Sequence, residues 1–237
     1  MSSGNEYDVI VVGGGVAACS AGLFTARQGL DTVIFRSDDS MLSMNAHLEN
    51  YPGFPEGINP EWFLELIETQ ARKNGCRFQE KEVDDVDRHP EGGFVVSTID
   101  SNTFDYRSSY LIGATAGNAE YLRALDVKII DQKHGSYVEA TDGGRTDREG
   151  LYVAGGLANK PLQAVVSAGH GAEVALALLE DSEQGFAHDW IVPEGFFTDG
   201  GGPVPPGCEE ISEDQQRERS QRAAGFLEEF FGQRAKE

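Results

Sequence analysis

The apolar positions of this 237-residue chain fall into periodic runs separated by breaks rich in glycine and proline. An apolar run at residues 8–12 predicts a buried strand, and the segment from about Val16 to Gln28 has helical periodicity, with Gly29 suited to its end. Residues 32–35 predict a second strand. A strand, a helix and a strand in this order form a βαβ unit, which predicts a parallel sheet.

The middle of the chain alternates between irregular and periodic stretches. Residues 37–59 lack periodicity, and Asn59 then predicts an N-cap for a helix that runs from Pro60 to Lys73 and is closed by Gly75. Its apolar stripe of Trp62, Phe63, Leu66 and Ile67 is expected to face the core. Residues 77–115 predict short antiparallel strands with a turn at 91–93, followed by a buried strand at 110–112.

The last third of the chain changes character after a strand near residue 151 and an Ala-rich helix over about 163–179. From residue 181 the sequence is irregular, and it then predicts a charged helix over about 212–234. We therefore predict an α/β fold: a single Rossmann-like domain at 6–180, with a parallel central sheet and a small antiparallel β-meander. Its two segments are 6–117 and 118–180, and a C-terminal arm and helix follow at 181–237.

Charge narrows the range of partners. The chain has 19 Lys and Arg against 40 Asp and Glu, a net charge of −21, which argues against nucleic acid and anionic membranes as partners. Such a surface repels itself in dilute salt and is tolerated when salt shortens the Debye length, which predicts a salt-loving (halophilic) cytoplasm; an ordinary acidic protein is the alternative. No apolar run is long enough to span a bilayer and no signal peptide is evident, so we expect a cytoplasmic location.

Two glycine-rich segments carry the candidate chemistry. Gly13, Gly15 and Ala18 form a G-x-G-x-x-A turn between a strand and a helix, which is typical of dinucleotide binding. A second segment, residues 150–156, leads into Gln163 and Ala164 at the start of a helix. The two segments together indicate FAD.

Arg36 occupies the position at the end of the second strand where an acidic residue usually binds a ribose hydroxyl. It could favour a 2′-phosphate, and hence NADP, or stack on adenine, or face solvent. Asp38 or Asp39 could instead supply the usual acid. The sequence leaves these alternatives open.

Residues 49–58 closely resemble the stretch that follows the flavin loop of low-molecular-weight thioredoxin reductases, and the segments at 114–117 and 155–164 fall in that family's order. The resemblance covers about residues 6–180. It implies that Asn50, Tyr51 and Pro52 lie near the isoalloxazine, that Val83 offers backbone to the adenine, that Gly155 and Gly156 approach the pyrophosphate and ribityl chain, and that Gln163 and Ala164 meet the pyrimidine end of the flavin. The expected cofactor-binding residues are Gly13, Gly15, Val16, Ala17, Ala18, Arg36, Met41, Leu42, Asn50, Val83, Thr115, Gly117, Gly155, Gly156, Gln163 and Ala164.

The chain also departs from that family. Only residues 118–149 separate the two FAD segments, where the family carries a complete NADPH domain with a second glycine turn and a C-x-x-C. The family's Gly-Gly-Gln-Leu is replaced by residues 39–42, and its Gly-Asp by Gly155 and Gly156, so we expect FAD to be held less tightly. Cys19, Cys76 and Cys208 are isolated from one another, and Cys208 is the best candidate for an accessible thiol. Among the scattered histidines, His170 could approach the flavin, and we expect no metal site.

These observations predict an FAD-dependent oxidoreductase of the thioredoxin-reductase-like group, which exchanges electrons with an external donor or acceptor, protein or small molecule. No side chain is assigned a catalytic role. The alternatives are a non-catalytic nucleotide-binding protein, acting as a sensor or assembly module, and an NAD(P)-binding single-domain protein. The aromatic residues of 185–197 predict an arm that, with the final helix, covers an apolar surface or joins two subunits in a homo-oligomer.

Overall fold

The computed structural model describes residues 5–37, 40–101, 103–182 and 188–234, except for the side chain of residue 105. The chain forms two compact units, residues 1–185 and 186–237. In the first unit the predicted βαβ unit is present as β1 (Glu6–Val12), α1 (Val16–Arg27) and β2 (Thr32–Arg36). Gly29 follows α1 with a φ of 87°, a value that favours glycine, and so allows the chain to turn back into β2.

The central sheet combines parallel and antiparallel strands. Strands β3 (Arg77–Glu80), β2, β1, β6 (Phe104–Gly113) and β9 (Leu151–Val153) run parallel, while β4 (Val83–Arg88) and β5 (Phe94–Thr98) form an antiparallel meander with β6. The turn predicted at 91–93 joins β4 to β5. The prediction of antiparallel strands from residue 77 is wrong for β3, because its backbone pairs in parallel with β2.

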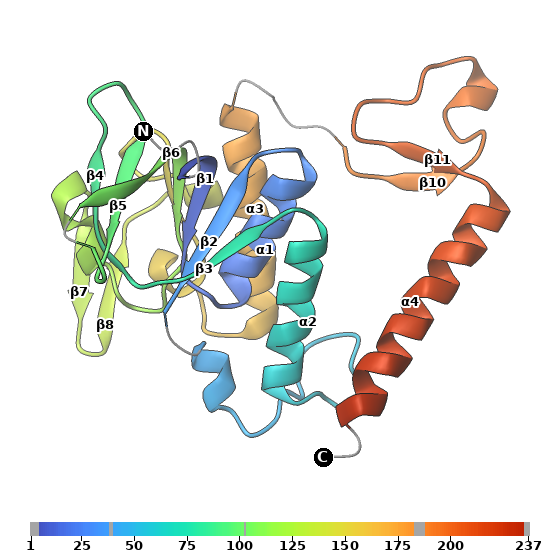
Figure 1. Cartoon of the computed structure of the whole chain (residues 1–237), viewed down its shortest axis with the longest axis horizontal. Coiled ribbons are helices and arrows are strands. Elements are labelled where there is room, and N and C mark those ends of the chain that lie inside the picture. The colour runs from blue at the N-terminus through green and yellow to red at the C-terminus, as the bar shows by residue number, and fades with distance from the viewer. Residues whose placement is uncertain (1–4, 38–39, 102, 183–187, 235–237) are drawn as a thin grey trace. The chain divides into compact units, whose positions relative to one another are not determined.

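Alternation of side chains along β1 divides the core into two layers. Val9 and Val11 pack against helices α1 and α3 (Ala164–Asp181), whereas Ile10 and Val12 belong to a cluster on the opposite face with Tyr121. All four β1 side chains are 5% exposed or less, as expected for a strand covered on both faces. Helices α1, α2 (Pro60–Lys73) and α3 lie on one side of the sheet (Figure 1).

Helix α2 has the predicted bounds, and the Asn59 side chain caps it by accepting hydrogen bonds from the backbone N–H groups of Glu61 (2.8 Å) and Trp62 (3.3 Å). Its predicted core stripe is only partly correct. Phe63 is buried, while Trp62, Leu66 and Ile67 are half-buried.

Short elements join the strands and helices of the first unit. They are η1 (Met41–Met44), η2 (Glu120–Leu125), the antiparallel hairpin of β7 (Ile129–Gln132) and β8 (Gly135–Val138), η3 (Asp142–Gly144) and η4 (Gly155–Ala158). All residues between β6 and β9 are described, and they form no α-helix and no parallel strand pair.

The second unit contains β10 (Ile191–Pro193), η5 (Thr198–Gly200), β11 (Glu209–Ile211) and α4 (Glu213–Arg234). Strands β10 and β11 pair in parallel, which the sequence did not predict, whereas α4 closely matches the predicted charged helix. The first residues of the aromatic stretch predicted at 185–197, namely 185–187, lie outside the described residues.

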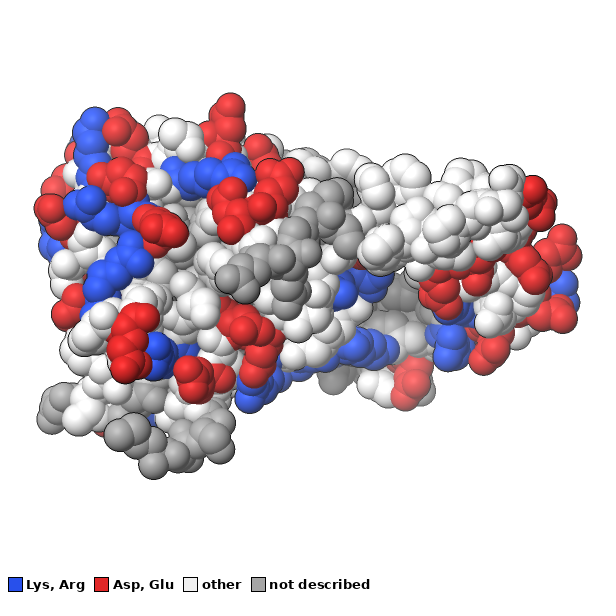
Figure 2. Space-filling view, turned by 90° about the horizontal axis from the view of Figure 1, so that it is seen from above, with Lys and Arg blue, Asp and Glu red and all other residues white. Residues whose placement is uncertain are grey.

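Figure 2 shows acidic side chains with Lys and Arg side chains between them, separated by broad uncharged areas. Many of the arginines pair with carboxylates. Arg145 contacts Asp181 (2.7 Å) and Glu180 (3.2 Å), for example, and Arg123 contacts Glu120 (2.6 Å). Within the described parts of the chain, no helix has the length and apolarity needed to cross a lipid bilayer.

Candidate functional site

The glycine turn after β1 shapes a cradle above the N-terminus of α1. Gly13 has a φ of 128°, and a Cβ atom there would lie 2.6 Å from the carbonyl oxygen of Ala114, so this position requires glycine. At Gly15 a Cβ atom would meet only the Ser40 hydroxyl, at 3.2 Å. No side chain caps α1. The N–H groups of the first turn of α1 therefore have no partner within the helix and no side-chain cap, which suits a phosphate group.

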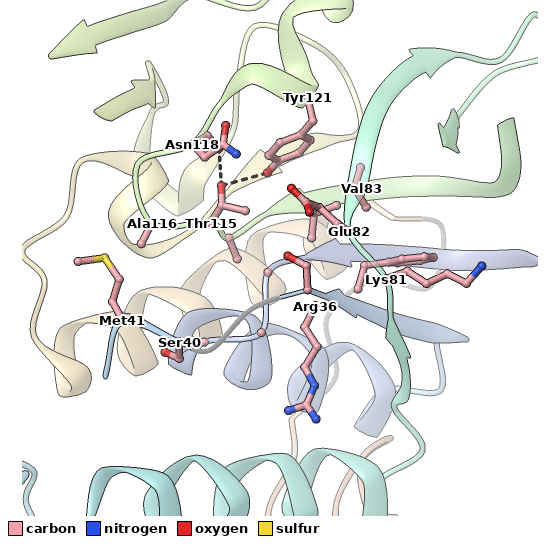
Figure 3. Close-up of a pocket in the computed structure, with 17 residues that line it drawn as sticks. Arg36, Ser40, Met41, Lys81, Glu82, Val83, Thr115, Ala116, Asn118 and Tyr121 are labelled. Carbon is pink, nitrogen blue, oxygen red and sulfur yellow. Dashed lines mark hydrogen bonds between the residues drawn. The ribbon is translucent and has the colours of Figure 1, made fainter. Parts of the chain in front are cut away.

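Two adjoining hollows extend from this cradle. The first hollow has a cavity volume of about 260 Å³ and is lined by Val12, Gly13, Gly14, Gly15, Phe35, Arg36, Ser37, Ser40, Met41, Lys81, Glu82, Val83, Ala114, Thr115, Ala116, Asn118 and Tyr121 (Figure 3). The second hollow has a volume of about 380 Å³ and is lined by Val16, Ala17, Ser40, Met41, Leu42, Met44, Asn45, Ala114, Thr115, Ala116, Gly156, Leu162, Gln163, Ala164 and Ser167.

The shared lining residues of the two hollows are Ser40, Met41, Ala114, Thr115 and Ala116. The first hollow alone is smaller than the ~300–1,000 Å³ typical of ligand pockets, so an extended dinucleotide would need both. The two remote segments predicted from sequence thus line one continuous site.

Contacts between the two segments hold this site together. The Asn50 side-chain amide donates a hydrogen bond to the side-chain oxygen of Gln163 at 2.8 Å. Helices α1 and α3 are packed so closely that a Cβ atom at Gly171 would lie 2.2 Å from the carbonyl oxygen of Ala17. The N-terminus of α3 carries no acidic residue and no side-chain cap, so its positive end faces the second hollow undiminished.

The chain is similar to an FAD-binding family and to thioredoxin reductases. Residues 8–48 match a family model described as an FAD binding domain. The thioredoxin reductase of Rickettsia felis is 26% identical over 176 residues, covering 73% of this chain and 56% of that protein. The thioredoxin reductase of Aquifex aeolicus is 35% identical over 102 residues, covering 41% of this chain and 31% of that protein. The chain thus spans at most about half the length of the curated relatives it matches.

The solved structure of a thioredoxin reductase from Gloeobacter violaceus superimposes with a TM-score of 0.61 at 19% identity, covering 73% of this chain and 94% of that chain. This likeness shows a shared fold. The chain is thioredoxin reductase-like, and FAD is its implied cofactor.

The cradle fits the dinucleotide of this thioredoxin reductase-like chain, since Gly15 lines the first hollow with no side chain of its own and no side chain caps the helix start behind it. Of the residues expected from sequence to bind the cofactor, those that line the hollows are Gly13, Gly15, Val16, Ala17, Arg36, Met41, Leu42, Val83, Thr115, Gly156, Gln163 and Ala164. Ala18, Asn50, Gly117 and Gly155 line neither hollow.

Each of these four residues has a structural contact or position instead. Ala18 is fully buried between sheet and helices, and Asn50 holds Gln163 in place. Gly117 packs on Gly135 of the hairpin, its carbonyl accepting from the Ser136 N–H at 2.9 Å. The Gly155 N–H donates to Nδ1 of His170 at 3.0 Å and is therefore not available to a phosphate.

Arg36 does not present its guanidinium to the site. Its Nε contacts both carboxylate oxygens of Glu80 at 2.8 Å, and its Nη1 contacts Glu68 at 2.5 Å. The Glu80 and Glu68 carboxylates raise the pKa of Arg36 and outweigh the opposing effect of partial burial. Figure 3 shows the side chain directed toward helix α2, away from Thr115. Asp38 and Asp39, the other candidates for the ribose, lie outside the described residues.

The resemblance places Tyr51 and Pro52 near the isoalloxazine, but neither residue lines a hollow. The Tyr51 ring packs against the rings of Phe63 in α2 and Phe54, with centroid distances of 4.6 Å and 6.3 Å. Burial raises the pKa of the Tyr51 hydroxyl. This aromatic group anchors the loop at 49–58 to α2.

His170, Cys19 and Cys76 are buried side chains. His170 is 5% exposed, and burial lowers its pKa, which agrees with a neutral ring that accepts from Gly155. Cys19 and Cys76 are buried, which raises the pKa of each thiol to about 12 and makes both poor nucleophiles. Cys208 is partly exposed. Among the described residues, no three His, Cys, Asp or Glu side chains are grouped in a way that could hold a metal ion.

Sequence reasoning missed eight hollow-lining residues with polar groups that could contact a ligand: Ser37, Ser40, Asn45, Lys81, Glu82, Asn118, Tyr121 and Ser167. Tyr121 is buried and lies 3.4 Å from the Thr115 hydroxyl, which in turn donates to the carbonyl of Asn118 at 2.6 Å. Lys81 and Glu82 immediately precede Val83, so the resemblance that selected Val83 could have drawn attention to them.

Proposed function

We propose that this chain is an FAD-binding oxidoreductase whose flavin exchanges electrons with an external donor or partner protein, and not through an NADPH domain and dithiol of its own. The observation that carries the proposal is the continuous site lined by both remote segments. When bound, FAD supplies the electron-transfer chemistry, and the chain supplies position and charge stabilisation.

The chain's own groups would act on the flavin mainly through backbone dipoles. Gln163 and Ala164 line the second hollow at the start of α3, where the N–H groups of the first turn have no partner within the helix. The Asn50–Gln163 hydrogen bond fixes this helix start relative to the loop at 49–58. A positive helix end in this position favours the charge that a flavin gains on reduction.

An apolar collar supports electron exchange with an outside partner. Met41, Met44 and Leu162 line the second hollow and are 49%, 82% and 63% exposed. Exposed apolar groups around a binding cavity often mark an interaction site. We therefore propose that a donor or acceptor reaches the flavin across this collar.

The segment between the two FAD segments supports the same proposal. Residues 114–150 form η2, a small hairpin and η3, without the strand, glycine turn and helix that a second nucleotide unit requires. The Cys19 and Cys76 thiols are buried and far apart in sequence from Cys208.

Location and assembly are part of the proposal. Three free cysteines fit a reducing compartment, so we propose that the protein acts in the cytoplasm. In the second unit Trp190 and Phe196 are 52% and 62% exposed. We propose that this unit joins two subunits or covers apolar surface through these rings. A truncation after Glu180 that stays soluble, monodisperse and able to bind flavin would contradict this role.

The test is absorption spectroscopy of the protein purified in high salt, with and without added FAD. We expect a flavin spectrum that dithionite bleaches and that NADPH alone changes only slowly, without saturation. A Gly15→Val variant, which adds side-chain atoms to the first hollow beside the flexible Ser40 side chain, should stay folded and lose the flavin, while Gly169→Ala should retain it, because a Cβ atom at Gly169 has nothing within 4 Å.

Two outcomes would contradict parts of the proposal. Rapid, saturable reduction by NADPH without a partner would show a nicotinamide site in the chain itself. A bound flavin that dithionite cannot reduce would favour the non-catalytic sensor or assembly role.

A further inference from the structure

Glu82 lies at the first hollow in a position that the glycine motif does not account for. It connects β3 to β4 and directly precedes Val83, and its backbone carbonyl accepts a hydrogen bond from the Ile99 N–H at 3.0 Å. This bond fixes the backbone where the side chain leaves it. Figure 3 shows the Glu82 carboxylate directed to the same side as Thr115 and Tyr121, which also line the hollow.

The two cations that line the same hollow are turned away from it. Arg36 is paired with Glu68 and Glu80. The Lys81 ammonium lies 5.8 Å from the centre of the Tyr106 ring, and Figure 3 shows it extending away from Thr115. Among the described residues that line the first hollow, Glu82 therefore provides the charge that faces the ligand.

A nucleotide bound with its pyrophosphate over the start of α1 would place its adenosine in the first hollow, between Gly15 and Val83. Ribose hydroxyls donate hydrogen bonds well to a carboxylate. The residue that usually accepts them, at the end of the second strand, is Arg36 in this chain.

We infer that Glu82 binds the ribose 2′-hydroxyl of the ADP portion of the dinucleotide and excludes a 2′-phosphate. This inference rests on the proposed FAD-binding function. A 2′-phosphate would bring about −1.5 to −2 charges next to the Glu82 carboxylate, while the two described cations of the first hollow, Arg36 and Lys81, are directed away from it, so the site should reject NADP-type ligands.

The test compares ADP with 2′-deoxy-ADP by calorimetry on the FAD-free full-length chain in high salt. In the unaltered protein, ADP should bind roughly ten- to a hundredfold more tightly, since one hydrogen bond to a charged group is lost in 2′-deoxy-ADP. Glu82→Ala should abolish this difference by weakening only ADP. Asp84→Asn, the loss of a nearby exposed carboxylate outside both hollows, should keep the difference and controls for net charge.

The inference would be overturned if Glu82→Ala and the unaltered protein showed the same affinity difference between ADP and 2′-deoxy-ADP. It would also be overturned if ADP did not bind at millimolar concentration. The unaltered protein gives a second, independent test: adenosine 2′,5′-bisphosphate should bind more weakly than AMP, and tighter binding would overturn the inference. If the flavin binds and is reduced but Glu82→Ala does not change the affinity difference between ADP and 2′-deoxy-ADP, the inference fails and the proposed function stands. A redox-silent flavin together with the expected ADP difference removes only the oxidoreductase role.

Discussion

Gly171 lies where helix α3 crosses helix α1, and the crossing brings the backbones of the two helices together next to the second hollow. A Cβ atom at Gly171 would lie 2.2 Å from the carbonyl oxygen of Ala17, whereas one at Gly169 in the same helix has nothing within 4 Å. Alanine substitutions at these two glycines therefore distinguish the effect of the close helix crossing from the effect of alanine's higher helix propensity.

Gly171→Ala should lower the free energy of unfolding by about 1–3 kcal/mol and weaken FAD binding, because the helices must move apart. Gly169→Ala should leave FAD binding unchanged and raise stability by up to about 1 kcal/mol, because alanine favours the helix. Urea denaturation and flavin titration of the two variants measure both effects. Equal effects at the two positions would contradict the close crossing.

His170 gives a pH-dependent prediction. Burial lowers its pKa in the folded state, so the unfolded chain takes up a proton at higher pH than the native protein does. The stability that comes from the neutral ring is present above the unfolded pKa of about 6.5 and is lost as the pH falls below it. Denaturation at pH 7.5 and 5.5 should show a larger loss for the unaltered protein than for His170→Asn, which has no titrating ring.

The same position tests the hydrogen bond to Gly155. His170→Leu leaves the buried Gly155 N–H without an acceptor and should cost about 1–3 kcal/mol of stability at pH 7.5, whereas the side-chain oxygen of His170→Asn can still accept. Equal stability of the Leu and Asn variants would contradict this role for His170.

At the scale of elements, the β10–β11 unit is organised by one side chain. The Glu210 carboxylate accepts from the backbone N–H groups of Gly195 (3.0 Å), Phe197 (2.6 Å) and Thr198 (3.0 Å), and from the Thr198 hydroxyl (2.8 Å). These hydrogen bonds outweigh the opposing effect of desolvation and lower the pKa of Glu210 to about 2. The aromatic segment at 195–198 is thus held by a carboxylate that stays ionised.

We expect the amide resonances of Phe197 and Thr198 to titrate with a pKa of about 2. The stability that the ionised Glu210 contributes is present above its unfolded pKa of about 4.5 and should be lost as the pH falls from there through about 2. Glu210→Gln should make the amides of 195–198 exchange faster at neutral pH, because an amide group cannot accept all four hydrogen bonds. Glu194→Gln, at a nearby exposed carboxylate, is the matched control. Unchanged exchange in Glu210→Gln would contradict this role.

At the scale of the whole molecule, the net charge of −21 sets the response to salt. Carboxylates distributed over the surface repel one another most strongly when the Debye length is long. We expect the free energy of unfolding to rise from low to molar KCl in chemical denaturation. Betaine, an uncharged osmolyte, should stabilise less at matched osmolality, and equal stability at low and high KCl would contradict the prediction of a salt-loving protein.

The sequence by itself determined the elements whose signals are local. The glycine turn, Asn59 with Pro60, and the apolar run of β1 act on residues within a few positions of themselves, and the structure has each element with nearly the predicted bounds. The pairing of the two remote glycine segments was also predictable, because both carry recognisable nucleotide-binding patterns.

Only the tertiary structure decided the roles that depend on partners distant in sequence. In the sequence Arg36 had several possible roles, whereas in the structure its guanidinium pairs with Glu68 of α2 and Glu80 of β3. His170 was a candidate flavin contact in the sequence, whereas in the structure its ring accepts a hydrogen bond from the Gly155 N–H. Glu82 gained a place in the site only when the β3–β4 connection was positioned beside Thr115 and Tyr121. Charge and hydrogen-bond partners arise from packing, and a local pattern does not specify which ones will meet.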